Sequence, residues 1–177
     1  MTQLFLEQAL NGLQFGLMLF LLAAGLTLVF GIMDMINLAH GSLYMVGAYL
    51  AAAAAAASGS FVIGVLAAVA GTMAVGALLE LAVLRRLYTR DHLSQVLATF
   101  ALILIANEAV RMVWGDQPVM LNAPEALAGP VEIAGFSYPA FRLLIIVVGV
   151  LVALALYVAV TKTRVGMWVR AGASNRE

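Results

Sequence analysis

Polar side chains interrupt an otherwise apolar sequence between Gly31 and Gly47, which reads GIMDMINLAHGSLYMVG. The segment includes Asn37, His40 and Gly41. It is either a plain turn whose polar groups face water, or a broken helix whose freed backbone groups line a pathway through a membrane. Composition favours the turn only slightly. Metal binding or proton relay usually needs a second ligand nearby, so we expect His40 to be a hydrogen-bonding residue at a helix start.

A second polar group consists of Asn107, Glu108 and Arg111. Glu108 and Arg111 are three residues apart, so they meet on one face of a helix. The simpler interpretation is a local ion pair that lowers the cost of placing both charges in apolar surroundings, and the alternative is a substrate or gating contact. Asn107 shares either role.

The sequence contains no HExxH, GxSxG or P-loop motif, the patterns that accompany zinc hydrolysis, serine hydrolysis and phosphate binding. We therefore predict a protein that is not an enzyme and has neither a resident cofactor nor a metal ion. If the protein uses ATP, another chain must bind it.

The composition excludes a soluble domain. The chain has 177 residues, of which 64% are hydrophobic and 10% are charged, whereas soluble domains carry about 25% charged residues. Most of the chain must therefore contact a lipid bilayer. The formal net charge is zero, which argues against nucleic acid as a partner. The absence of cysteine excludes disulfides and thiolate metal sites.

Five apolar runs are long enough to cross a bilayer as helices, which requires about 20 residues each. We predict an all-α, polytopic transmembrane bundle within a single domain, residues 1–177. Glycine and alanine are dense in the first three runs, and such residues allow helices to approach closely in lipid. The predicted spans cover residues 9–33, 38–57, 61–84, 93–113 and 141–160.

The basic residues predict the orientation, because cytoplasmic segments near span ends carry the positive excess. Seven of the nine lie in two segments, after the third and the fifth spans. Both segments should be cytoplasmic, which places the N-terminus outside. The first residues lack the positive charge of a signal peptide, so we expect no cleavage. The seven are Arg85, Arg86, Arg90, Lys162, Arg164, Arg170 and Arg176.

The stretch from Gly25 to Tyr49, GLTLVFGIMDMINLAHGSLYMVGAY, resembles the signature of the membrane permeases of branched-chain amino-acid ABC importers. The resemblance continues from Arg85 to Gly115 and from Arg164 to Glu177. The last segment is similar to the start of the family's cytoplasmic coupling loop, which predicts ATPase coupling by residues 162–177. The matching residues there are Gly166, Arg170, Ala171, Asn175, Arg176 and Glu177.

The resemblance implies a multi-pass permease of the bacterial inner membrane that moves branched-chain amino acids by ATP-driven alternating access. It implies four kinds of partner: a second homologous permease, two cytoplasmic ATP-binding subunits, a periplasmic substrate-binding protein and the bilayer itself. The candidate motif or pathway residues are Asn37, His40, Gly41, Gly47, Asn107 and Glu108.

Four alternatives stay open at this stage. Related permeases transport urea, short amides or other amino acids. Family members continue for about three further spans, so we expect this chain to be C-terminally truncated or one part of a split permease. A nonfunctional remnant or a small membrane scaffold is the alternative from another class. An ion channel would show a polar ring along a span, and the middles of the third and fifth spans lack one.

Overall fold

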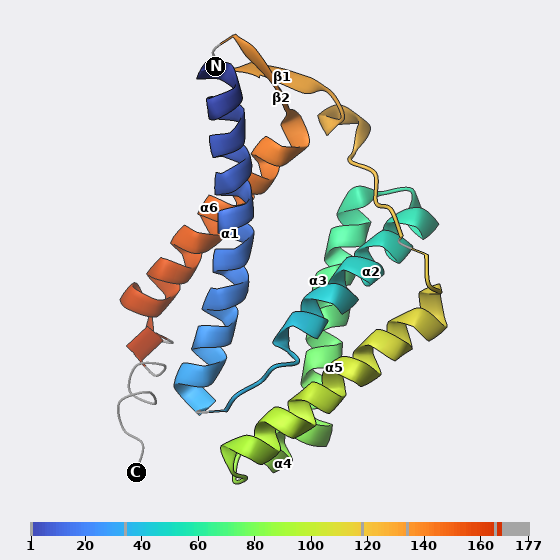
Figure 1. Cartoon of the computed structure of the whole chain (residues 1–177), viewed down its shortest axis with the longest axis vertical. Coiled ribbons are helices and arrows are strands. Elements are labelled where there is room, and N and C mark those ends of the chain that lie inside the picture. The colour runs from blue at the N-terminus through green and yellow to red at the C-terminus, as the bar shows by residue number, and fades with distance from the viewer. Residues whose placement is uncertain (1, 34, 118, 134, 165, 168–177) are drawn as a thin grey trace. The chain divides into compact units, whose positions relative to one another are not determined.

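The computed structural model describes residues 2–33, 35–117, 119–133, 135–164 and 166–167. It contains α1 (Thr2–Met33), α2 (His40–Ser58), α3 (Phe61–Leu79), the π-helical turn η1 (Glu80–Leu84), α4 (Arg85–Leu87), α5 (His92–Trp114), the 3₁₀ turn η2 (Glu125–Leu127), β1 (Pro130–Ile133), β2 (Phe136–Pro139) and α6 (Ala140–Lys162) (Figure 1). The chain packs as two compact units, one formed by residues 1–32 and 123–177 and the other by residues 33–122.

Five helices in the described part of the chain are long and apolar enough to cross a membrane, which confirms the predicted polytopic helical bundle. The first helix begins at Thr2 rather than at residue 9. The third continues without a break through η1 and α4, so its apolar span runs from Phe61 to Leu87. Its last turns therefore carry Arg85 and Arg86, which the sequence placed in a loop.

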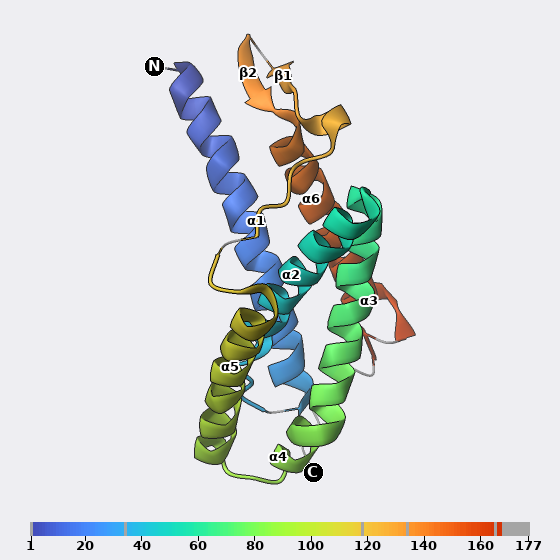
Figure 2. The same cartoon turned by 90° about the vertical axis from the view of Figure 1, so that its right-hand side faces the viewer.

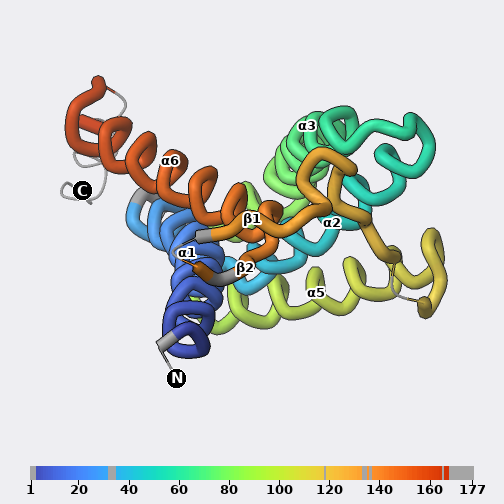
Figure 3. Tube along the Cα trace, turned by 90° about the horizontal axis from the view of Figure 1, so that it is seen from above, coloured from blue at the N-terminus to red at the C-terminus, as the bar shows by residue number. Residues whose placement is uncertain are grey.

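The unit formed by residues 1–32 and 123–177 holds the two-stranded hairpin, which the sequence did not predict. Its strands pair antiparallel, with Val131 opposite Tyr138. Gly135 lies in the connection at a φ of 83°, a left-handed conformation that glycine adopts without strain. α6 starts directly after β2 and crosses α1, as Figure 3 shows from above. At the crossing Gly149 lies against Leu17: a Cβ on this glycine would be 3.2 Å from the Leu17 Cβ.

Hydrogen bonds attach the hairpin to α1. Asn11 Oδ1 accepts from the Tyr138 hydroxyl at 2.9 Å and from the Arg142 guanidinium at 2.8 Å. The Gln3 side-chain amide donates to the Gly135 carbonyl at 3.2 Å. Tyr138 is fully buried. The hairpin is thus held by side chains 127 and 132 residues away in sequence, and Arg142 at the start of α6 shares the Asn11 acceptor.

In the unit formed by residues 33–122, α2 and α3 form a closely packed antiparallel pair (Figure 2). Gly59, at a φ of 68°, ends α2, and Ser60 caps the start of α3 through a bond from the Ile63 amide. Glycine sits where the helices approach most closely. A Cβ on Gly64 would lie 2.7 Å from the Ala51 carbonyl oxygen. Without a hydrophobic force between helices in lipid, such close backbone packing holds the pair together.

The α2–α3 contact predicts that Gly64→Ala destabilises the protein. The new methyl would collide with the backbone of α2, and overpacking of this kind costs about 1–3 kcal/mol. Gly76→Ala is the matched control on the same helix, since its Cβ would have no neighbour nearer than 3.9 Å. Thermal unfolding in detergent should show a lower Tm for the Gly64 variant alone. Equal Tm values for the two variants would contradict the packing.

Candidate functional site

The polar segment between α1 and α2 is a break in the helices, and every second residue from Met35 to Ala39 is buried. Met35, Asn37 and Ala39 are nearly inaccessible to solvent, with Asn37 5% exposed. The Asn37 side-chain oxygen accepts a bond from the Ala39 amide at 3.0 Å. This bond satisfies a backbone donor just before α2 begins at His40. Asn37, one of the polar residues of this segment, therefore does not face water.

Gln95 of α5 supplies the partners that the broken backbone lacks. Its side-chain oxygen accepts from the Ile36 amide at 3.2 Å. Its side-chain nitrogen donates to the carbonyls of Leu87 at 3.2 Å and Arg90 at 3.1 Å. Gln95 is 2% exposed. One buried amide thus joins the α1–α2 break to the connection between α4 and α5.

Thr99 lies one turn beyond Gln95 and is fully buried. Its hydroxyl donates to the Gln95 carbonyl at 2.8 Å and lies 3.5 Å from the Ile36 carbonyl. Sequence reasoning missed both residues. The available signal was a pair of polar residues spaced by four at the start of an apolar helix, which marks one face.

Apolar packing encloses the same region. Met35 and Ala39 of the break form a buried cluster with Leu84 of η1 and Leu102 of α5. Tyr88 packs against this cluster. The break, the end of the third helix and the start of α5 therefore form one packed end of this unit.

The π-helical turn η1 begins at Glu80, whose carboxylate accepts a hydrogen bond from the Tyr88 hydroxyl. Burial, followed by the bond to Glu80 and its negative charge, raises the pKa of Tyr88 to about 12. The phenol therefore stays neutral at physiological pH, and its hydroxyl proton stays on the bond to Glu80. Single π-helical turns occur often at functional sites.

The predicted ion pair between Glu108 and Arg111 is present on α5. Arg111 NH1 lies 3.1 Å from Glu108 Oε1, and its Nε lies 2.7 Å from Asp116 Oδ1. All three side chains are more than half exposed, and Asn107 is exposed beside them. Glu108 follows Gln95 by 13 residues, about 20 Å along the helix. The two polar groups therefore lie at opposite ends of α5.

The remaining candidate residues have different surroundings. Gly47 lies at the α2–α3 contact, where a Cβ would be 2.7 Å from the Thr72 hydroxyl oxygen, whereas no atom lies within 4 Å of a Cβ on Gly41. His40 is half-buried at the start of α2. The described residues contain no cluster of three or more potential metal ligands.

The predicted coupling segment is described only as far as residue 167. Gly166 is buried, and a Cβ there would overlap the backbone carbonyl of Val160. Its amide donates to the Thr163 hydroxyl at 3.3 Å. Only glycine fits this position. Arg170, Ala171, Asn175, Arg176 and Glu177 lie outside the described residues.

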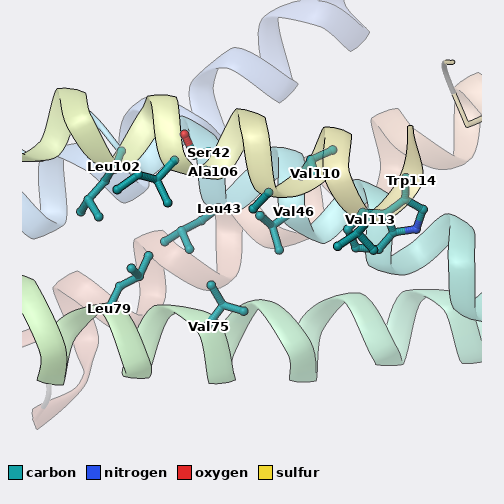
Figure 4. Close-up of a pocket in the computed structure, with 13 residues that line it drawn as sticks. Ser42, Leu43, Val46, Val75, Leu79, Leu102, Ala106, Val110, Val113 and Trp114 are labelled. Atoms are coloured by element: carbon teal, nitrogen blue, oxygen red, sulfur yellow. The ribbon is translucent and has the colours of Figure 1, made fainter. Parts of the chain in front are cut away.

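An apolar cavity of about 260 Å³ lies between α2, α3 and α5. Figure 4 shows Leu43 and Val46 of α2, Val75 of α3, and Leu102 and Val110 of α5 around it. The residues that line it place almost no polar group in the cavity. It is therefore suited to hydrocarbon and not to a charged ligand.

Comparison with known proteins connects this geometry to transport. Residues 8–177 match the family described as the permease component of the branched-chain amino acid transport system. The chain belongs to this family. Its members are membrane transport components and not catalytic enzymes. No solved structure matches the permease chain.

Curated relatives match over a shorter part. The permease is 51% identical over 47 residues to the high-affinity branched-chain amino acid transport system permease protein BraD of Pseudomonas aeruginosa, which covers 27% of this chain and 15% of the relative. It is 50% identical over 46 residues to the corresponding protein LivH of Escherichia coli and of Salmonella typhimurium, covering 26% of this chain and 15% of each relative.

The Gln95 network predicts that Gln95→Leu lowers the stability of the permease. The substitution leaves the Ile36 amide and the carbonyls of Leu87 and Arg90, all partly buried, without their side-chain partner, and a fully buried group left without a partner costs about 1–3 kcal/mol. Gln117→Leu, at an exposed position, is the control. We expect a lower Tm in detergent for the first variant and an unchanged Tm for the second. An unchanged Tm for Gln95→Leu would show that the bonds are dispensable.

Proposed function

We propose that this protein is a permease subunit of an ABC importer that moves branched-chain amino acids across the bacterial inner membrane. The family match over residues 8–177 carries the proposal, and five helices of membrane-spanning length support it. The substrate is inferred from the printed names of the relatives. In this proposal the permease works beside a second homologous permease.

Two cytoplasmic ATP-binding subunits complete the proposed inner side. The sequence lacks a P-loop, so ATP hydrolysis belongs to these partners. They bind the basic coupling segment at the end of α6, residues 162–177. The tight position of Gly166 against Val160 supports this role, because a segment packed on the end of α6 transmits movement to that helix.

A periplasmic binding protein delivers the substrate on the proposed outer side, where the N-terminus also lies. The connection between α5 and α6 carries Asp116, Glu125 and Glu132, all exposed. Glu132 belongs to the hairpin that Gln3 and Asn11 hold against α1. Glu125 and Glu132 belong to the same unit, and their negative charges are suited to dock a partner by charge complementarity.

Uptake in whole cells tests the proposed substrate. We expect deletion of this gene to abolish uptake of labelled leucine in cells that carry the complete transport system, and the wild-type gene to restore it. Labelled urea measured in the same cells should be taken up equally in both strains. Loss of urea uptake with leucine uptake intact would assign the permease to the alternative substrate class.

The proposed ATPase contact predicts that Arg170→Glu weakens co-purification of the permease with its ATP-binding subunit. Reversing one charge in a charge-assisted contact costs about 1.5–3 kcal/mol, or roughly ten- to hundredfold in affinity. Arg86→Glu is the control, since Arg86 is an exposed basic residue of α4 outside the coupling segment. Equal recovery of the ATP-binding subunit with both variants would exclude the contact.

A further inference from the structure

The polar residues of α5 lie on the side of the helix that faces away from α2 and α3. Leu102, Ala106 and Val110 point toward the apolar cavity beside these helices (Figure 4). At about 100° per residue, Arg111 lies on the side opposite Leu102. Asn107 and Glu108 flank Arg111 on that side, and all three are exposed.

This outward side of α5 changes character along its length. Its first part consists of large apolar side chains, each at least half exposed. Its last part consists of the amide of Asn107, the carboxylate of Glu108 and the guanidinium of Arg111. The apolar residues are Leu93, Leu97, Phe100 and Leu104, with exposed fractions of 67%, 60%, 52% and 52%.

The polar part begins inside the helix that is long and apolar enough to span a membrane. Asn107 precedes Trp114, the last residue of the apolar span, by seven residues, about 10 Å along the helix. Charged side chains within spans face a water-filled cavity or the interior of a bundle, because hydrocarbon cannot solvate them. The side chains of Glu108 and Arg111 are each 57% exposed. Pairing with each other therefore does not bury their charges, which still require a polar environment.

We propose that the outer half of α5 lines a water-filled vestibule on the substrate pathway, in which Glu108 and Arg111 meet the two charges of a zwitterionic amino acid. This inference rests on the proposed function. In the structure the Arg111 guanidinium lies 2.7 Å from Asp116 and 3.1 Å from Glu108. A zwitterion offers a carboxylate to Arg111 and an ammonium to Glu108, so the exchange leaves the net charge of the vestibule unchanged.

The chain contains no cysteine, so a single introduced thiol reports its own surroundings. Asn107→Cys leaves the ion pair in place. Leu66→Cys is the control of matched depth: Leu66 is 64% exposed and apolar and lies five residues, about 8 Å, from the start of α3. Leu104→Cys tests the apolar part of the same side of α5. Gln117→Cys, in the exposed connection after α5, reports access of the reagent to the outer surface.

A membrane-impermeant maleimide is added to intact cells that carry the complete transport system. We expect Asn107→Cys to react about tenfold faster than Leu66→Cys and Leu104→Cys, because the reactive thiolate forms in water and not in hydrocarbon. Gln117→Cys should react fastest. If Asn107→Cys does not react with the maleimide while Gln117→Cys does, the vestibule is overturned. The vestibule is also overturned if Leu66→Cys reacts as fast as Asn107→Cys. A silent Gln117→Cys overturns the outward placement of this end of α5.

Leucine uptake by the same cells tests the pathway. Labelled Asn107→Cys should lose most of its uptake, while Gln117→Cys labelled to the same extent keeps it. Adding Glu108→Gln to Asn107→Cys should reduce uptake about tenfold or more through loss of a charged contact, with the labelling rate unchanged. Intact leucine uptake by labelled Asn107→Cys, or by the variant that also carries Glu108→Gln, overturns the proposed contact between these residues and the substrate. Absence of leucine uptake by the wild type contradicts the proposed function instead, and leaves the accessibility result standing.

Discussion

The satisfaction of backbone polar groups in an apolar environment is the constraint on which the unit formed by residues 33–122 depends. Helices satisfy their own amides and carbonyls, so every interruption must find partners elsewhere. The interruption between α1 and α2 finds them in Asn37 and, from another helix, in Gln95. Because Gln95 also binds the carbonyls of Leu87 and Arg90, two chain connections share one side chain. A displacement of either connection would expose unsatisfied groups in the other, which couples them mechanically.

Close backbone packing supplies the rigidity that this coupling needs. Gly47, Gly64 and Gly71 let α2 and α3 approach until neighbouring atoms leave no room for a methyl group. Such contacts replace the hydrophobic effect, which is weak between helices that are already surrounded by lipid. Within the unit formed by residues 1–32 and 123–177, different contacts hold the helices and the hairpin together. There, Asn11 collects donors from Tyr138 and Arg142, and Gly149 allows α6 to cross α1 at Leu17.

The sequence predicts what depends on local pattern. Apolar run lengths predict five spans, because a helix must be long enough to cross hydrocarbon, and the spacing of Glu108 and Arg111 predicts their ion pair. The sequence does not predict the partnership of Gln95 with Ile36, 59 residues away, because no local rule links them. The hairpin was missed for the same reason: its strands have four residues each, and tertiary bonds to Gln3 and Asn11 hold it in place.

The π-helical turn at Glu80 changes the phase of the third helix. In an uninterrupted α-helix a residue returns to the same face after seven positions, and the eighth is turned away by about 80°. Tyr88 is the eighth residue after Glu80, yet its hydroxyl reaches that carboxylate. The turn from Glu80 to Leu84 takes up one extra residue, so position eight occupies the place of position seven. The surface pattern of the basic end, including Arg85 and Arg86, thus follows a register of its own, offset by one residue from the apolar pattern before it.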